Sequence, residues 1–205
     1  MEADDRRPVP GGYAKGRIRR EDIISAAAVV YGEMGYHGSS LREIGKRAGI
    51  SHAGLLYHFR TKEALLAAVL ERRDAEDAVR ERLTVPPGLD VLRHFVALAE
   101  HNVRHPGIVE LYSRLAAEAI APDHPAHAYF ERHYRDARDS VVQSFRVLAE
   151  SGELRPGVDP EMAALTFIAL MDGLQVQWLT TPTHVDPAGS LRFSLQTLLT
   201  VPLFP

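Results

Sequence analysis

Cysteine is absent from this chain of 205 residues. The absence excludes disulfide bonds, cysteine nucleophiles, thiolate metal sites and cysteine-based redox chemistry. Long hydrophobic runs are also missing, because Asp172, Gln175 and Gln177 interrupt the longest apolar region, Ala163–Leu179, which falls short of the roughly 18 consecutive apolar residues of a membrane span. The N-terminus begins with acidic residues and lacks the apolar segment of a secretory signal. We therefore expect a cytoplasmic protein with no membrane contact.

Motifs of catalytic sites are missing as well. The chain contains no glycine-rich phosphate loop, no Gly-x-Ser-x-Gly turn and no His-Glu-x-x-His zinc motif. We expect neither an enzyme nor a bound cofactor. Ten histidines leave metal sensing open as an alternative, although their spacing leaves the third ligand undefined. Six of them fall on two neighbouring segments: His94, His101, His105, His124, His127 and His133.

Hydrophobic residues recur with helical spacing along most of the chain. Residues 1–16 are the exception, because prolines, glycines and charges leave too little apolar surface to order them, and we expect a flexible tail there. From Arg17 onward the pattern predicts about nine helices and no convincing strand, with glycine and proline at the breaks. The predicted fold class is therefore all-α, and a hydrophobic content of 45% is enough for a buried core.

Two short helical segments joined by a tight turn follow the first predicted helix. Ser40 and Glu43 have the spacing of a capping box at the start of the first segment. Gly49 supplies the turn, and Ser51 is the expected N-cap of a short helix over 52–59. This is the helix-turn-helix arrangement. We expect six apolar side chains to form its core: Leu41, Ile44, Ala48, Ile50, Leu55 and Phe59.

Charge is unevenly distributed, although the whole chain is close to neutral at -3. Residues 15–63 carry nine cations and five anions, a net charge of +4, whereas residues 64–205 carry 13 cations and 19 anions, a net charge of -6. A basic helix-turn-helix unit attached to an acidic body is typical of a nucleic-acid-binding protein with a second domain. We therefore predict a tail (1–16), a DNA-binding domain (17–63) and a larger domain (64–205). The alternative for the basic segment is an ordinary solvated surface.

A more specific motif follows the helix-turn-helix. It runs Tyr57-His58-Phe59-Arg60-Thr61-Lys62-Glu63-Ala64-Leu65. From about Arg17 to Leu66 the chain resembles the TetR family of bacterial transcriptional regulators. The remainder resembles that family only in architecture. The resemblance implies an N-terminal three-helix DNA-binding domain and a larger C-terminal helical domain that binds an effector and forms the dimer.

DNA contacts are expected from the helix-turn-helix and the start of the next helix. The short helix would lie in the major groove with its N-terminal residues facing the base edges. There His52 can bond to a purine and Ala53 can touch a thymine methyl group, while Tyr57 and Lys62 would contact phosphates. The family resemblance assigns similar roles. The full set of predicted DNA-binding residues is Ser40, Arg42, Ser51, His52, Ala53, Gly54, Tyr57, His58 and Lys62.

Two positions depart from the family pattern. The family has a hydroxyl residue where this chain has Gly54, and a tyrosine where it has Leu56, so two of the usual contacts are lost. A basic run of Arg17, Arg19 and Arg20 before the first helix can compensate by reaching phosphates or a minor groove. A solvated helix start explains the same run equally well.

The segment 159–178 is apolar on nearly every side, as expected of a helix buried both in its own domain and against a partner. Together with the last helical segment, it predicts a two-fold four-helix interface, which the family resemblance also implies. A homodimer would place two recognition helices in successive major grooves, so the operator should be an inverted repeat. The last segment contributes Leu191, Phe193, Leu195, Leu198 and Leu199.

An effector pocket is expected between the middle helices, lined by apolar and aromatic groups with a few polar ones. Ordinary core packing is the competing interpretation for each aromatic residue. Asp172 and Gln175 are more informative, because buried polar groups need partners across a dimer or in a ligand. The candidate ligand-binding residues are Phe95, His101, Tyr112, Phe130, Tyr134, Phe167, Met171, Gln175 and Trp178.

These predictions together describe a ligand-responsive regulator. Its partners would be a double-stranded DNA operator, a second copy of the chain and a small-molecule effector of unknown identity. We expect a repressor that the effector releases from DNA. Activation of transcription, and an architectural DNA-binding protein without an effector, are the alternatives.

Overall fold

A computed structural model describes residues 11–80 and 85–205 of the chain, with side chains over 19–73 and 85–205. This part of the chain forms nine helices, and its only β pairing is an isolated bridge between Leu154 and Leu199. The all-α prediction is confirmed. In chain order the helices are α1 (Gly11–Gly38), α2 (Leu41–Arg47), α3 (His52–His58), α4 (Lys62–Arg80), α5 (Leu89–Arg104), α6 (Pro106–Glu118), α7 (His127–Glu150), α8 (Pro160–Thr180) and α9 (Pro187–Leu198).

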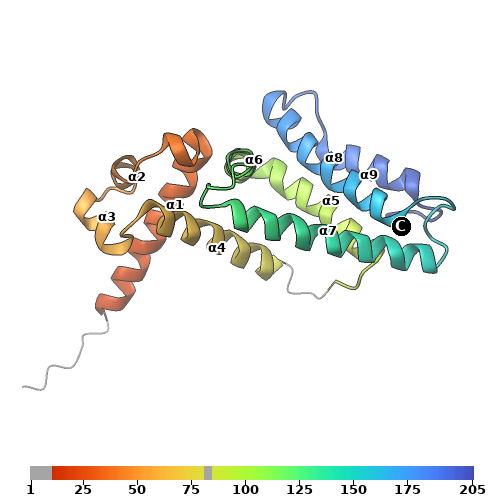
Figure 1. The fold of residues 1–205 in the computed structure, drawn as a ribbon, viewed down its shortest axis with the longest axis horizontal. Helices are drawn as coiled ribbons and strands as arrows, with labels where there is room; N and C mark the ends of the chain where they lie inside the picture. Colours follow the sequence, from red (N-terminus) through yellow and green to blue (C-terminus); the bar gives the residue numbers. More distant parts are fainter. Residues whose placement is uncertain (1–10, 81–84) are drawn as a thin grey trace, which may run out of the picture.

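The helices gather into two parts of the molecule. Helices α1–α4 form one end, and α5, α7, α8 and α9 run alongside one another in the other part (Figure 1). Helix α6 lies between them and packs against both α1 and α8. The N-terminal unit and the larger helical unit expected from the sequence are therefore both present.

Side-chain caps set the starts of the short N-terminal helices. The Ser40 hydroxyl accepts a hydrogen bond from the Glu43 backbone N–H at 3.2 Å, and the Ser51 hydroxyl accepts one from Gly54 at 3.1 Å. Between them Gly49 takes a φ of 66°, a left-handed conformation that favours glycine. The predicted caps and turn of the helix-turn-helix are confirmed.

The first helix begins earlier than the sequence predicts. Helix α1 starts at Gly11, so residues 11–16 belong to it and not to the tail; residues 1–10 lie outside the described residues. Extending an existing helix needs no new nucleation, which explains how the glycine-rich segment joins it. Near its other end α1 is kinked at Gly35, where φ is 73° and ψ is 177°.

Buried side chains form two clusters. The first joins α1–α4 to α6 and the start of α7, and it includes Leu65 of α4 and Leu115 of α6. The second fills the space between α5, α7, α8 and α9, around Phe145 and Phe167. The predicted domain boundary at residue 63 is therefore not a packing boundary, because α4 and α6 bury apolar side chains in the same core as α1.

Helix α8 is the one helix of the described residues that is long and apolar enough to cross a membrane by length and composition alone. It packs against α6, α7 and α9, and it buries Phe167, Met171 and Leu174. A central helix of a helical bundle has the same composition, because neighbouring helices cover it on several sides.

Candidate nucleic-acid interface and cavity

The N-terminal half of α3 lies on the surface of the molecule. Leu55 is fully buried and anchors the helix, whereas His52 and Ala53 are exposed and Gly54 is half-buried. This orientation follows from the sequence, because Leu55 is the only residue of the helix that reaches the core. The structure thus leaves His52 and Ala53 free to approach base edges.

Tyr57 is the most exposed large hydrophobic residue described, at 86% of its maximal surface. Its ring meets that of half-buried His58 edge to face, with 5.3 Å between the centroids. An exposed tyrosine with no role in the core presents both its ring and its hydroxyl to a partner. Arg42 and Ser40, on the preceding helix and its cap, are exposed as well.

Lys62 differs from the other predicted DNA contacts because its ammonium is engaged within the protein. The Lys62 Nζ donates a hydrogen bond to the backbone carbonyl of Ser39 at 2.6 Å and lies 4.3 Å from the centroid of the Tyr36 ring. Burial lowers the pKa of Lys62 below its ordinary value. In this conformation Lys62 connects the start of α4 to the turn between α1 and α2, and a phosphate contact would use its remaining N–H groups.

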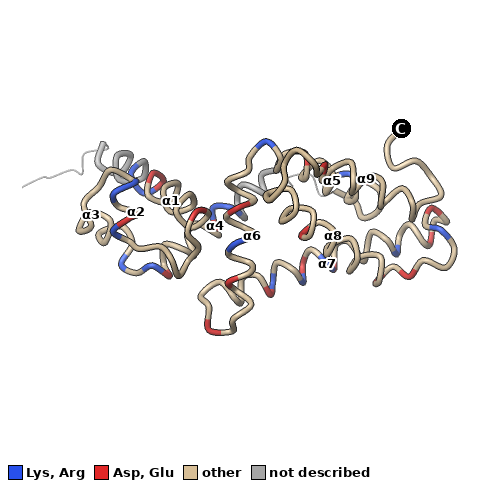
Figure 2. Tube along the Cα trace, turned by 90° about the horizontal axis from the view of Figure 1, so that it is seen from above, with Lys and Arg blue, Asp and Glu red and all other residues tan. Residues whose placement is uncertain are grey.

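Basic residues occur on the N-terminal unit together with acidic ones (Figure 2). Some of this charge is engaged internally, since Arg47 forms an ion pair with Glu33 of α1 at 2.8 Å. The Arg20 guanidinium lies 4.9 Å from the centroid of the Phe59 ring, and the Arg17 side chain lies outside the described residues. The exposed cations available to a DNA backbone are therefore fewer than the sequence suggests.

A compact polar cluster, which we call the junction, lies where α1 meets α6. Glu118, at the end of α6, accepts a hydrogen bond from the Tyr36 backbone N–H at 2.6 Å. Its carboxylate occupies the space beside Gly35, where an added Cβ would lie 1.9 Å from Oε1. One turn earlier on α1, Gly32 allows close contact with α6, and its carbonyl accepts a bond from Arg114 Nε at 2.7 Å.

The side chains of the junction also bond to one another. The Tyr36 hydroxyl donates to Glu63 at 2.7 Å, and this bond lowers the pKa of Glu63. His124 is 4% exposed, and its Nδ1 accepts from the Ala126 N–H at 3.1 Å. Because Nδ1 is an acceptor, the proton of neutral His124 is on Nε2, which lies 3.5 Å from the Glu118 carboxylate. The junction thus connects α1, α4, α6 and the α6–α7 loop.

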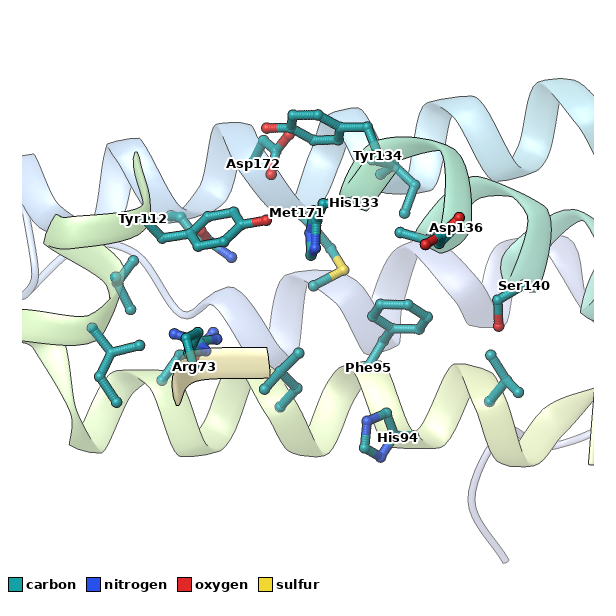
Figure 3. Close-up of a pocket in the computed structure, with 18 of the residues that line it drawn as sticks. Arg73, His94, Phe95, Tyr112, His133, Tyr134, Asp136, Ser140, Met171 and Asp172 are labelled. Carbon is teal, nitrogen blue, oxygen red and sulfur yellow. The ribbon is translucent and has the colours of Figure 1, made fainter. Parts of the chain in front are cut away.

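The larger unit contains a cavity of about 570 Å³. Its walls come mainly from α5, α6, α7 and α8, and α4 contributes Arg73 (Figure 3). Five of the nine predicted ligand-binding residues line it: Phe95, Tyr112, Tyr134, Met171 and Gln175.

Three other predicted residues lie behind this lining. Phe130 is 4% exposed and packs on the Tyr112 ring at 4.9 Å between centroids, while Phe167 is 2% exposed and supports Phe95 at 5.6 Å. Trp178 belongs to a much smaller void that also touches Ala99 and Leu191. These aromatic groups serve as core, which was the competing interpretation.

His101, the remaining predicted ligand-binding residue, does not line the cavity. Its ring stacks on that of His105 at 4.0 Å between centroids. On α5 the cavity is lined by an arc of residues spaced three or four apart, and His101 falls just outside this arc by helical geometry. The arc consists of Val91, His94, Phe95, Leu98 and Asn102.

Several polar lining residues were not predicted from the sequence. Arg73, Asn102, Tyr129, His133 and Asp136 all face the cavity. A usable signal existed for Asn102, which lies three residues after Ala99 and shares the apolar face of α5. Nothing in the local pattern indicated Arg73, because its helix belongs to the N-terminal unit.

Two of the charged groups that line the cavity, Asp172 and Arg73, have partners within the protein. Tyr134 forms a side-chain hydrogen bond to Asp172, and burial raises the pKa of Asp172 above its ordinary value despite this bond (Figure 3). The Arg73 guanidinium lies 5.6 Å from the Tyr112 ring centroid and has a further interaction within the protein. Asp172, which the sequence singled out as a buried polar residue, thus finds a partner within its own chain.

Histidines are scattered in the structure. Among the described residues, no group of three or more His, Cys, Asp or Glu side chains is arranged to hold a metal ion. His94 lines the cavity, His101 stacks on His105, and His124 belongs to the junction. This arrangement gives the metal-sensing alternative no support.

Two family models match the chain. The model of bacterial regulatory proteins of the tetR family matches residues 23–69, which cover α2, α3 and parts of α1 and α4. The model of the C-terminal part of BetI-type transcriptional repressors matches residues 91–200, which include nearly all of α5–α9.

Curated relatives are similar over different shares of the chain. The HTH-type transcriptional regulator PksA of Bacillus subtilis is 28% identical over 193 residues, 87% of each chain. The A-factor receptor protein of Streptomyces griseus is 26% identical over 75% of this chain, but the match spans only 52% of that relative. The regulator BetI of Yersinia pestis is 34% identical over 42% of this chain and 44% of its own length.

Solved structures share the fold. A TetR-family regulator from Agrobacterium tumefaciens aligns with a TM-score of 0.74 at 21% identity, over 90% of this chain and 99% of that one. A complex of SmeT with triclosan aligns with a TM-score of 0.69 at 24% identity, over 92% of this chain and 95% of the other.

Proposed function

Since the chain belongs to the TetR family of bacterial regulatory proteins, we propose that it is a transcriptional repressor which binds an operator as a homodimer and leaves it when a small molecule binds. The family consists of transcriptional regulators and not of enzymes. The observation that carries the proposal is the capped, surface-exposed start of α3, with His52 and Ala53 pointing outward beside Tyr57.

The proposed DNA interface uses the exposed part of the predicted set. Helix α3 enters the major groove, where His52 and Ala53 contact bases, while Arg42 and Tyr57 bind the phosphate backbone. Ser40 and Ser51 keep their helix starts in place through their caps and can donate their hydroxyl protons to phosphates. Gly54, His58 and Lys62 complete the surface.

Dimerisation is proposed through α8 and α9. Apolar side chains on these helices are exposed in the single chain, including Phe193 at 75% and Met162 at 59%. Leu165 and Val176 extend the exposed stripe along α8. A four-helix interface between two copies would cover these residues, and its two-fold symmetry implies an inverted-repeat operator.

The proposed effector site is the cavity between α5, α6, α7 and α8. Its volume lies within the range of pockets that hold drug-sized molecules. Support comes from two similar proteins, one named a receptor and the other solved with triclosan. We place the protein in the cytoplasm, where its DNA partner is.

The test is a set of mobility-shift titrations on DNA recovered by genome-wide selection of bound fragments. We expect Tyr57→Ala to weaken binding to all sequences about tenfold, and His52→Ala to change the preference at particular bases. Arg42→Ala should also flatten the salt dependence, because it removes a cation from the phosphate contacts. Unchanged binding for all three variants would refute the interface.

Two further measurements separate the parts of the proposal. Sedimentation of the wild-type chain should give a dimer at micromolar concentration, and Phe193→Asp should give a monomer that binds a single half-site weakly. A reporter driven by the selected DNA distinguishes repression from activation. An architectural DNA-binding protein would keep its affinity for the operator in the presence of every ligand that binds the cavity.

A further inference from the structure

Two polar atoms in the wall of the cavity have no hydrogen-bond partner in the protein. They are the hydroxyl oxygen of Tyr112 and the Oδ1 of Asn102, and both are shielded from solvent. Asn102 is only 6% exposed. Buried polar groups in folded proteins nearly always have partners, and an unpaired one therefore indicates a missing contact.

The two atoms need different hydrogen-bond partners. The Tyr112 hydroxyl can donate to an acceptor such as a carbonyl oxygen, whereas the Asn102 Oδ1 accepts from a donor such as a hydroxyl group. The Tyr112 hydroxyl points toward His133 and Met171, which also line the cavity (Figure 3). The two residues line the same cavity from α6 and α5, and because both atoms are shielded, a ligand reaches them only when neighbouring side chains move aside.

The charges of the lining disfavour an ionic ligand. Arg73 and Arg132 balance Asp136 and Asp172, so the cavity has no excess of either sign. Inside, Asp172 already bonds to Tyr134, and Arg73 already interacts within the protein. An ion beside Asp172 and Arg73 would lose its hydration without gaining an unpaired opposite charge, whereas Arg132 and Asp136 are exposed to solvent.

Apolar groups form the rest of the wall. Phe95 is held edge to face against buried Phe167, and Met171 lies between Phe95 and the Tyr112–Tyr134 side of the cavity (Figure 3). Ile168 and Leu98 extend this surface. A ligand that fills the cavity therefore presents mostly hydrocarbon to it.

We propose that the cavity binds an uncharged, mainly apolar molecule with one carbonyl and one hydroxyl group, the carbonyl bonded to Tyr112 and the hydroxyl to Asn102. This inference rests on the proposed function, in which the same cavity is the effector site. It adds the chemical class of the effector and the two residues that recognise it.

Five naphthalenes of similar size test the proposal by fluorescence titration of the full-length protein. The probes are 6-acetyl-2-naphthol, 2-acetylnaphthalene, 2-naphthol, 6-hydroxy-2-naphthoate and 2-naphthyl-trimethylammonium. We expect 6-acetyl-2-naphthol to bind at least tenfold more tightly than either ion. It should also bind more tightly than each probe that carries only one of its two polar groups.

Variants then assign the two contacts. Tyr112→Phe should raise the Kd of the two acetyl probes about tenfold, the effect of about 1.4 kcal/mol, and leave 2-naphthol unchanged. Asn102→Leu should do the reverse, raising the Kd of the two naphthols and leaving 2-acetylnaphthalene unchanged. Thr181→Val removes a hydroxyl from the exposed end of α8, away from the cavity lining, and is the matched control. If Asn102→Leu does not fold, Asn102→Ala replaces it.

The proposal stands if each variant weakens only the probes that carry the group bonded to the substituted residue, a result that we call the crossed pattern. Any one of three results would overturn the proposal. They are binding of an ion that equals or exceeds that of 6-acetyl-2-naphthol, equal losses of affinity for all probes in both variants, and no binding of any probe at about 1 mM. Mobility shifts with the bound probe distinguish it from the proposed function. If the crossed pattern appears while operator affinity stays constant, the ligand class stands and effector release is refuted.

Discussion

The junction and the cavity are built from the same kinds of side chain but use them differently. Each contains a tyrosine, a histidine, a carboxylate and a cation. In the junction most of these groups bond to one another and to the backbone, as Glu118 does to Tyr36, and His124 Nε2, which has no hydrogen-bond partner, lies 3.5 Å from the Glu118 carboxylate. In the cavity Tyr112 and Asn102 have no protein partner. The comparison teaches that the polar groups of the junction hold α1 against α6, whereas two of those in the cavity wall are left unpaired by the protein and, in our proposal, bond to a ligand.

The largest expected effect comes from filling the space at the kink of α1. Gly35→Ala should lower the free energy of unfolding by about 3 kcal/mol, because the φ of 73° is unfavourable for alanine and the new Cβ displaces the Glu118 carboxylate. Urea denaturation at fixed protein concentration measures it. Gly38→Ala, whose Cβ would meet only Met34 at 3.6 Å, is the control and should cost far less.

A smaller loss is expected from removing the acceptor at the junction. Glu118→Ala leaves the Tyr36 N–H without its bond and should cost about 2 kcal/mol in the same assay. Glu110→Ala, an exposed position on the same helix, should be close to neutral. Equal stability of the two variants would contradict the role given to Glu118.

The junction should also make stability depend on pH through His124. Burial lowers the pKa of His124 in the folded protein below the ordinary value of 6.5, so the unfolded chain binds the proton more tightly. Neutral His124 makes its full contribution to the free energy of unfolding above pH 6.5, and this contribution is lost as the pH falls toward the folded-state pKa. We expect the unfolding free energy of His124→Gln to fall less steeply below pH 6.5 than that of the wild type. An equally steep fall in the two proteins would contradict this role of His124.

The smallest effect concerns the cavity and has the opposite sign. Burial raises the pKa of Asp172. Its neutral form therefore contributes to the free energy of unfolding at low pH, and this contribution is lost as the pH rises through the folded-state pKa. Asp172→Asn should therefore raise the melting temperature slightly when the pH is above the folded-state pKa of Asp172, and the gain should shrink as the pH falls through that pKa and the wild-type carboxyl also becomes neutral. A lower melting temperature at pH 7 would show that ionised Asp172 supports the fold.

The sequence predicts the N-terminal unit more fully than the cavity. The caps at Ser40 and Ser51 and the turn at Gly49 depend on residues within a few positions of one another, so local rules locate them. The lining of the cavity depends on how four helices are rotated against each other. Periodicity places Phe95 and Phe167 on inner faces, but only packing puts one in the wall and the other behind it.

By itself, the sequence determined the all-α fold, the helix-turn-helix, the family and the separation of basic and acidic regions. The tertiary structure alone decided that Lys62 bonds to Ser39, that α4 shares the core of α1, and that Tyr112 and Asn102 are left without partners. The physical reason is the distance along the sequence over which each interaction acts. Capping and helix periodicity act over three or four residues, whereas a hydrogen bond between distant segments requires the whole chain to be folded around it.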